Sequence, residues 1–352
     1  MNKILLCGRF AFGTSDNGGQ PVKSRELFLA LEEKFGKGNV DYTDTLGWKR
    51  NPFKLIGQFF IKAKKSDCII MLPAQNGVKV FSRLLIFAKK HYRKKIFYSV
   101  IGGWLPKILE TNGALKKILK EFNGIWVETS SMKADMDAMG FDNVYVVPNF
   151  KSLKSADVPE YEDFLKQFRD TVRFCTFSRV SKEKGIEDAV EAIKAANKHF
   201  GGKPKICLDI YGQIDDNYKK RFDNLKSQFP EYISYKGIVS PGESVDVLKN
   251  YYALLFPTFY NGEGFPGTLI DALASCLPSI VSDWHFNTEI IADGKTGYVF
   301  NTKSIDQLLN CIISSVENPD IIYNMKINCK KEYKKYDKEA VVDAIESLIA
   351  KG

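Results

Sequence analysis

The sequence predicts an α/β protein of two Rossmann-like domains, each with a parallel sheet that helices cover on both faces. Short apolar runs rich in Ile, Val, Tyr and Phe alternate with amphipathic helical patterns, which is typical of parallel strands buried on both faces. The alternation runs through the chain twice, and the polar segment 150–170 separates the two series as a linker. The length of 352 residues also exceeds what one core usually holds.

These apolar runs are the expected strands. They are residues 3–8, 67–72, 96–102, 125–129 and 144–148 in the first series, and 172–178, 206–212, 233–237, 252–257 and 278–283 in the second. We therefore expect an N-terminal domain over residues 1–155, a C-terminal domain over 165–335 and a final segment, 336–352, with a helical pattern at 337–350. Because such sheets bind ligands beyond the carboxyl ends of their strands, the natural site is the cleft between the domains.

The composition excludes several classes of protein. An apolar fraction of 44% and an aromatic fraction of 13% suit a well-packed globular chain. No segment approaches the roughly twenty uninterrupted apolar residues of a membrane-spanning helix. Residues 1–13 are interrupted too soon by Arg9 for a signal peptide and indicate a first buried strand. The cysteines are scattered and lack the spacing of zinc or disulfide sites, so we expect a cytoplasmic protein.

Positive charge is concentrated in the first half of the chain. Residues 1–155 hold 26 Lys and Arg against 13 Asp and Glu, whereas the rest holds 25 against 29. Segments 53–65 and 80–95 have helical patterns with an apolar face and terminal lysines, which can lie on an anionic bilayer. The alternative is that both helices pack on the first sheet and leave their lysines in solvent. We expect peripheral contact with an anionic membrane surface, and no nucleic acid, because basic strand faces lack interleaved aromatics.

Two loops that precede helices have the residues of an anion site. After the strand that ends at Ser178, Arg179 and Lys184 lie near a helix start, where two cations and free N–H groups suit a diphosphate. A solvated basic turn is the alternative. Gly18 and Gly19 follow the first strand and either let the backbone approach a phosphate or sugar, or simply form a turn. Without a GxGxxG fingerprint, a nicotinamide cofactor is disfavoured.

Two carboxylates flank a predicted helix start within residues 259–284. Glu263 lies in the turn "NGEGFPG", and Asp271 lies one to two turns into a helix expected over 266–275. Asp271 is eight positions after Glu263, which corresponds to about 12 Å along a helix, whereas the acid and base of a glycosidase lie about 5–9.5 Å apart. The two acids would instead hold different parts of one long ligand, with N–H groups around Gly267–Leu269 between them. Asp271 would accept from ribose hydroxyls, or would be an ordinary surface aspartate.

Three segments together carry a resemblance to a known family. They are "SRVSKEKG" from residue 178, "GEGFPGTLIDALASCLPSIVSD" from residue 262 and "NTEIIADGKTGYVF" from residue 287. The chain resembles the retaining nucleotide-sugar glycosyltransferases of family 4. Their GT-B fold has two Rossmann-like domains whose parallel sheets face each other across a cleft. The resemblance covers most of the second half of the chain. In the first half it is limited to the topology and to the loop with Gly18 and Gly19.

The resemblance implies a role for each residue of the site. Arg179 and Lys184 would hold the donor diphosphate, and Glu263, the first acid of an E-x7-E pattern, would contact the donor sugar. Asp271 stands where the family has a glutamate that holds the ribose, so this position departs from the pattern. Further donor contacts are expected at Gly18, Gly19, Phe265, Pro266, Gly267, Thr268 and Leu269, and around the base at Gly212 and Val239.

The resemblance also implies a reaction without a metal ion or cofactor. Arg179, Lys184 and the helix dipole would stabilise the leaving diphosphate, whose phosphate would act as the base while the acceptor attacks the same face. Asp135 and Asp137 of "ADMDA" resemble a metal-binding DxD but fall within an expected helix. The family's final helix crosses back to the first domain and hinge motion closes the cleft, and we expect both here.

The acceptor side departs from the family pattern. Family members often carry a histidine near the reacting sugar, whereas the loop here reads "GGW", with Gly103 and Trp104 as acceptor-side candidates. This loop resembles members that build bacterial surface polysaccharides. His91 and His199 are expected at the surface, and His285 near the donor.

We therefore expect a retaining, metal-independent glycosyltransferase. It would move a hexosyl unit from a nucleotide diphosphate sugar, with uridine as the expected base, to a lipid-linked or growing surface polysaccharide. One alternative is a nucleotide-sugar epimerase of the same fold, which would release altered sugar without an acceptor. Another is a non-catalytic subunit that binds nucleotide sugars without turnover.

Overall fold

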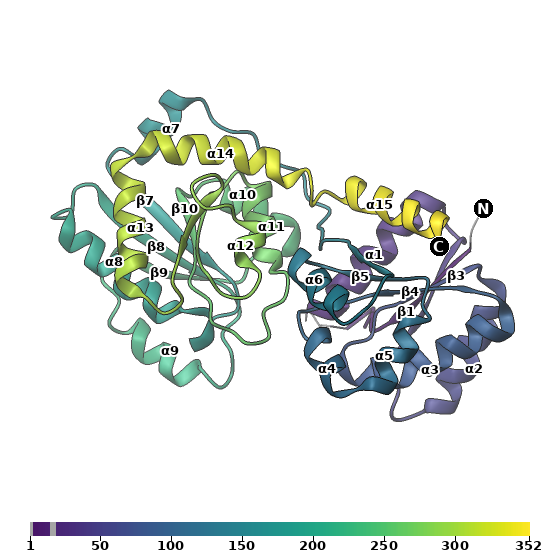
Figure 1. Ribbon diagram of the computed structural model, residues 1–352. Coiled ribbons are helices and arrows are strands. Elements are labelled where there is room, and N and C mark those ends of the chain that lie inside the picture. Colours follow the sequence, from purple (N-terminus) through teal and green to yellow (C-terminus); the bar gives the residue numbers. More distant parts are fainter. Residues whose placement is uncertain (1–2, 15–18) are drawn as a thin grey trace. The chain divides into compact units, whose positions relative to one another are not determined.

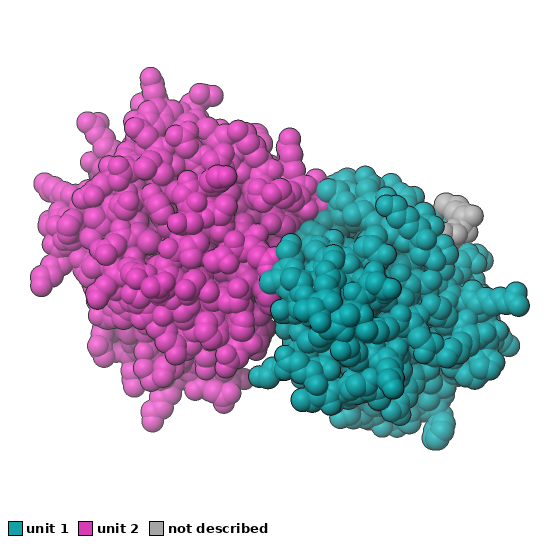
Figure 2. All heavy atoms as spheres, in the orientation of Figure 1, with its two compact units in different colours: residues 1–152, 338–352 teal, residues 153–337 magenta. Residues whose placement is uncertain are grey.

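A computed structural model describes residues 3–14 and 19–352 of the protein (Figure 1). The chain forms two compact units, which Figure 2 colours separately. Unit 1 comprises residues 1–152 and 338–352, and unit 2 comprises residues 153–337. Each unit contains a six-stranded parallel sheet surrounded by helices, which confirms the predicted fold class.

The sheet of unit 1 has the strand order β2-β1-β3-β4-β5-β6, and its neighbours all pair in parallel. Its strands are β1 (Ile4–Gly8), β2 (Val40–Asp44), β3 (Cys68–Met71), β4 (Lys95–Ser99), β5 (Gly124–Val127) and β6 (Val144–Val146). Its helices are α1 (Gly19–Phe35), α2 (Pro52–Lys65), α3 (Gln75–Tyr92), α4 (Leu105–Thr111), α5 (Gly113–Lys120), α6 (Ser130–Ala138) and α15 (Lys338–Lys351).

The helix α15 completes the core of unit 1, although it is encoded some 190 residues after β6. Its apolar side chains Val341, Ile345 and Ile349 belong to the same buried cluster as the β1 strand, and the helix packs beside α1 (Figure 1). On the outside, Lys34 of α1 pairs with Asp343 at 2.8 Å. Burial of the apolar stripe holds this helix in place, because exposed ion pairs contribute little.

The sheet of unit 2 has the order β12-β11-β10-β7-β8-β9, again parallel throughout. Its strands are β7 (Thr171–Phe177), β8 (Lys205–Tyr211), β9 (Ile233–Gly237), β10 (Ala253–Phe256), β11 (Ser279–Ser282) and β12 (Gly297–Phe300). Its helices are α7 (Tyr161–Phe168), α8 (Ile186–His199), α9 (Lys219–Lys226), α10 (Ser244–Leu248), α11 (Gly267–Ala274), α12 (Asn287–Ile290), α13 (Ile305–Glu317) and α14 (Pro319–Tyr333), with 3-10 turns η1 (Lys182–Lys184) and η2 (Pro241–Glu243).

Both faces of this second sheet are buried. Because successive strand residues point to opposite faces, Phe174 and Cys175 of β7 belong to two separate apolar clusters. Lys326 of α14 is also wholly buried, with its Nζ 3.1 Å from the carbonyl oxygen of Tyr251. Burial lowers the pKa of this ammonium from its usual value of 10.5 to about 8.

The sequence prediction named neither the strand β2 nor the strand β12, and it treated the segment that contains the helix α7 as a linker. The strands β2 and β12 each lie at the edge of their sheet. The sequence of β2, "VDYTD", is too polar to stand out as a buried run, because an edge strand has only one neighbour to pair with. The expected linker 150–170 contains α7, whose Phe164 and Phe168 are buried one helical turn apart. Among the residues that the structure describes, no helix has the length and apolar character needed to cross a membrane.

Candidate functional site

The carboxyl edge of the unit 2 sheet has the topology of a ligand site. The chain proceeds from β7 outward through β8 and β9, then returns to β10 on the other side of β7 and continues through β11 and β12. The strand order therefore reverses between β7 and β10. Open α/β sheets bind their ligands outside the carboxyl ends of the strands at such a reversal. The loops that follow β7 and β10 carry Lys184 and Glu263.

These two side chains form a shielded ion pair. Lys184 Nζ lies 2.5 Å from Glu263 Oε2, and the side chains are only 13% and 9% exposed. Thr258 Oγ1 donates to the same carboxylate oxygen at 2.9 Å. The ammonium also lies 5.1 Å from the ring centroid of Tyr260 and 5.3 Å from that of Phe256. The carboxylate and two aromatic rings thus fix the position of the ammonium before any ligand is bound.

Glycine permits the close approach of the loops around this pair. Gly185 has φ +69°, and a Cβ there would lie 2.1 Å from the carbonyl oxygen of Pro257, directly after β10. The backbone of Phe259 also donates to the Glu183 carbonyl at 2.7 Å. The loop after β7 therefore rests on the loop after β10 with no room for a side chain between them.

Gly212 plays the same structural part on the other side of β7. It has φ +134°, and a Cβ there would lie 1.8 Å from the carbonyl oxygen of Ser178. Its N–H donates to the Gly237 carbonyl at 2.8 Å, which ties it to the loop that carries Val239. The two loops expected to frame the base are thus joined by a backbone hydrogen bond.

The structure does not bring Arg179 to this ion pair. Its side chain is 59% exposed, and its Nη1 lies 3.9 Å from Asp215 Oδ2. Within the described residues, Arg179 forms its ion pair with Asp215, whereas Lys184 forms its ion pair with Glu263. The two cations that the sequence places on one loop therefore have different partners.

The predicted helix after Glu263 is confirmed, as α11 covers Gly267–Ala274. Pro266 precedes it without a side-chain cap, and the N–H of Leu269 in the first turn donates to the Pro266 carbonyl at 3.0 Å. Thr268 of this turn donates from Oγ1 to the Phe177 carbonyl at the end of β7, and Leu269 is fully buried. The ring of Phe265 is buried as well, so only the backbone at this position can serve a ligand.

Asp271 is not the surface residue that one interpretation of the sequence allows. It is 2% exposed, and its Oδ1 accepts from Ser244 Oγ at 2.9 Å. Ser244 begins α10, shortly after the loop that contains Val239. The carboxylate thus connects α11 to the segment that follows β9.

The acceptor-side candidates lie beyond the carboxyl end of β4 in unit 1. Gly102 has φ +84°, and its N–H donates to Glu128 Oε2 at 3.1 Å. Glu128 also forms a buried ion pair with Lys23 at 2.6 Å. Trp104 Nε1 donates to the Ile101 carbonyl at 2.7 Å, which closes the tight loop around Gly103.

The remaining predicted positions fall as follows. Gly19 begins α1, whereas Gly18 lies outside the described residues. His91 and His199 are exposed, as predicted, and His285 is exposed beside Trp284, with ring centroids 4.7 Å apart. Asp135 and Asp137 lie in α6, where Asp137 pairs with Lys133.

Sequence reasoning missed four polar residues that shape the two sites. Thr258 and Ser244 hold the predicted acids Glu263 and Asp271, and Lys23 and Glu128 support the loop after β4. Thr258 could have been found from its place directly after the strand "YALLFP". The others lie in patterns that do not distinguish them from ordinary helix and turn residues.

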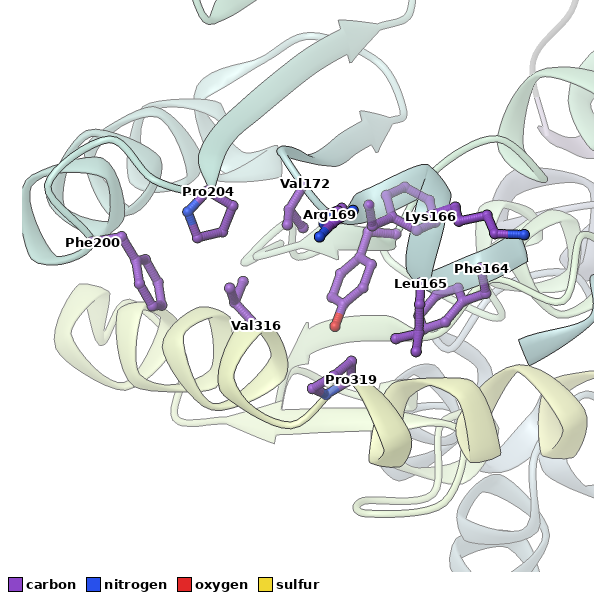
Figure 3. A pocket seen from close by; sticks show the side chains of 11 residues that line it. Phe164, Leu165, Lys166, Arg169, Val172, Phe200, Pro204, Val316 and Pro319 are labelled. Carbon is purple, nitrogen blue, oxygen red and sulfur yellow. The ribbon is translucent and has the colours of Figure 1, made fainter. Parts of the chain in front are cut away.

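A mostly apolar cavity lies elsewhere in unit 2. It has a volume of about 480 Å³ and lies near the amino ends of β7 and β8, because Val172 and Pro204 line it; Lys184 and Glu263 follow the carboxyl ends of their strands. Figure 3 shows the side chains that line the cavity. Its lining residues are Phe164, Leu165, Lys166, Phe168, Arg169, Val172, Phe200, Pro204, Tyr252, Val316 and Pro319. The Lys166 ammonium points away from it (Figure 3). The lining offers no carboxylate, thiol or imidazole, so this cavity is not the candidate site.

The two six-stranded parallel sheets with their surrounding helices define a fold class, the GT-B fold of glycosyltransferases. Residues 157–340 match the family model described as glycosyl transferases group 1, and the chain belongs to this family. The matched segment contains the Lys184–Glu263 pair, the helix α11 and Asp271.

Curated relatives resemble part of the chain. The GtfA subunit of UDP-N-acetylglucosamine–peptide N-acetylglucosaminyltransferase from Streptococcus gordonii is 31% identical over 158 residues, which are 43% of this chain and 29% of that protein. Alpha-monoglucosyldiacylglycerol synthase from Acholeplasma laidlawii is 29% identical over 206 residues, 57% of this chain and 49% of that protein. The matches thus span less than half the length of either relative.

Solved structures resemble the whole chain. Anabaena HepE in complex with UDP superposes with a TM-score of 0.75 at 14% identity, covering 99% of both chains. Sucrose-phosphate synthase from Thermosynechococcus elongatus gives 0.74 at 16% identity, covering 99% of this chain and 98% of that one. At such identities the likeness concerns the fold alone.

Proposed function

We propose that the protein is a retaining, metal-independent hexosyltransferase that uses a UDP-sugar as donor. The observation that carries the proposal is the Lys184–Glu263 pair, held within 2.5 Å at the strand-order reversal of unit 2. The names of the relatives support the donor class. GtfA is named for transfer from UDP-N-acetylglucosamine, and HepE was solved with UDP and with UDP-glucose.

Each residue has a role in this proposal. Lys184 stabilises the charge that develops on the leaving diphosphate, and Arg179, whose side chain is 59% exposed, joins it when the donor binds. The first N–H groups of α11 donate to phosphate or sugar oxygens. Glu263 accepts from a donor-sugar hydroxyl while its other oxygen keeps Lys184 and Thr258 in place. Asp271 and the loop at Val239 hold the ribose and base.

In the proposed reaction the acceptor oxygen attacks the anomeric carbon as the bond to the diphosphate breaks. The attack comes from the face that the leaving group vacates, so the configuration is retained. The acceptor proton passes to the departing phosphate oxygen. Charge stabilisation by Lys184, Arg179 and helix α11 takes the place that a metal ion has in other transferases.

A donor panel and a product analysis test this proposal. UDP-, GDP- and ADP-sugars are titrated against the protein by calorimetry, and we expect UDP-glucose or UDP-N-acetylglucosamine to bind best. Glu263→Ala should bind the nucleotide part but lose turnover, and activity in excess EDTA should persist. An inverted anomer in the product, seen by NMR, would disprove retention. Release of an altered sugar without an acceptor would favour the epimerase, and binding without turnover would favour the non-catalytic subunit.

We further propose that the acceptor is a lipid-linked or surface polysaccharide at the inner face of the cell membrane. Residues 52–95 hold 11 Lys and Arg against a single acid, Asp67. On the helices of this segment the apolar side chains of Phe53, Ile61 and Phe87 are 86%, 62% and 43% exposed. Exposed apolar side chains surrounded by cations suit an anionic bilayer. The apolar side chains insert into the bilayer, and the lysines contact the anionic headgroups.

Vesicle flotation tests the membrane contact. The protein should float with phosphatidylglycerol vesicles and not with phosphatidylcholine vesicles, and added salt should weaken the binding. Phe53→Asp should reduce the bound fraction several-fold. Ile321→Asp, which changes a 42% exposed side chain of α14 in unit 2, is the control. Equal losses in both variants, or equal binding to both lipids, would contradict the proposal.

A further inference from the structure

A cluster of aromatic rings surrounds the carboxyl ends of β1 and β2 in unit 1. Phe10 is fully buried, and the ring of Phe12 stacks on it with centroids 5.9 Å apart and planes 9° apart. Phe28 and Tyr42 meet Phe12 at centroid distances of 5.9 and 5.2 Å. Of these four aromatic side chains only Phe12 is exposed, at 39%. The cluster thus presents one supported aromatic ring to solvent at the ligand-binding edge of the sheet.

Hydrogen bonds from one carboxylate fix the backbone that carries this ring. Asp44, which ends β2, accepts from the N–H of Phe10 at 3.1 Å and of Ala11 at 2.9 Å. The same carboxylate accepts from the N–H of Leu46 at 2.9 Å, so it joins the loops after β1 and β2. Arg25 of α1 donates to the Phe10 carbonyl at 3.0 Å.

The backbone is also held in a conformation that is uncommon for a side chain. Ala11 has φ +51°, in the left-handed region, directly before Phe12. A non-glycine residue stays there only where its surroundings hold it, as Asp44 and Arg25 do here. The orientation of Phe12 is therefore set in advance, and little further ordering is needed when a ligand binds.

We propose that Phe12 is a stacking platform for a pyranose ring of the acceptor glycan. A pyranose presents a face of C–H groups that packs on an aromatic ring, while its hydroxyls remain free for hydrogen bonds. A single exposed ring is far too small for a protein partner, which needs about 800 Å² of surface, but it matches one sugar. This inference rests on the proposed glycosyltransferase function, because it names the chemistry of the acceptor.

Saturation-transfer NMR with methyl β-D-glucopyranoside and methyl β-D-galactopyranoside tests the platform. In wild-type protein, at least one glycoside should receive saturation mainly on the C–H protons of one ring face. Phe12→Ala should weaken its binding by about 3–10-fold, and Phe12→Trp, which keeps an aromatic face, should restore it. Tyr145→Ala is the matched control, because Tyr145 is 38% exposed on β6 of the same sheet.

Several results would overturn the platform. They are the absence of a signal in wild-type protein, saturation spread evenly over the ring protons, and equal losses in Phe12→Ala and Tyr145→Ala. Calorimetry with UDP-glucose separates this outcome from failure of the proposed function. If all variants bind UDP-glucose like wild type while glycoside binding is unaffected by Phe12→Ala, only the platform is wrong. If wild-type protein binds no nucleotide sugar, the proposed function itself fails.

Discussion

Gly185 is the position where one added methyl group should do most harm to the donor site. Its φ of +69° costs another residue about 1–2 kcal/mol, and its Cβ would lie 2.1 Å from the Pro257 carbonyl oxygen. Because carbon–oxygen contacts are normally about 3.3 Å or more, the loops after β7 and β10 must separate by about 1 Å. That movement would pull Lys184 from Glu263, and a displacement of about 1 Å can lower a rate by about 100-fold.

Gly201→Ala provides the control for this change. Gly201 also has a positive φ, +59°, but no atom of the residues that the structure describes lies within 4 Å of its Cβ position. Gly201→Ala should lower the free energy of unfolding by about 1–2 kcal/mol and leave donor affinity unchanged. Gly185→Ala should lower it by about 2–4 kcal/mol and weaken UDP-glucose binding by at least about tenfold. Urea unfolding and calorimetry measure the two quantities. Equal effects of both substitutions would refute the steric argument.

Three further predictions concern buried polar groups. Thr258→Val should lower turnover by about 10-fold, because Glu263 loses a donor, while Thr258→Ser should retain it; equal turnover would contradict this. Asp271→Asn should weaken UDP binding more than Ser244→Ala does, and calorimetry that ranks them in reverse would show that the carboxylate does not meet the nucleotide. Lys326→Met should raise the free energy of unfolding at pH 7 by about 1–2 kcal/mol, since a lysine with a pKa lowered from 10.5 to about 8 destabilises the fold while charged. This advantage should shrink between pH 8 and 10.5 in urea titrations, and a gain independent of pH would point to packing instead.

The sequence was enough to predict the class of fold, because ten of the twelve strands are apolar runs. The two missed strands, β2 and β12, are edge strands, for which the apolar signal is weak. The beginning of α11 was predictable from glycine and proline followed by an apolar helical pattern.

The partners within the site were not predictable in the same way. Lys184 and Glu263 are 79 residues apart, and they meet because β10 inserts beside β7 when the strand order reverses. Spacing along the chain carries no information on that order. The spacing of Arg179 and Lys184 correctly placed both residues on one loop. It could not show that their side chains pair with different acids. Lys23 and Glu128, 105 residues apart, were missed for the same reason.

The position of α15 in unit 1 has a consequence for biosynthesis. A ribosome releases residues 3–146, with all six strands of the first sheet, long before the helix that seals this sheet against water exists. During that interval an apolar surface near β1 is exposed to solvent or bound by a chaperone. This is the surface that Val341, Ile345 and Ile349 later cover. Unit 2 is contiguous, whereas unit 1 is built from two segments that flank unit 2 in the chain. The core of the N-terminal half therefore cannot be completed until α15 has been synthesised.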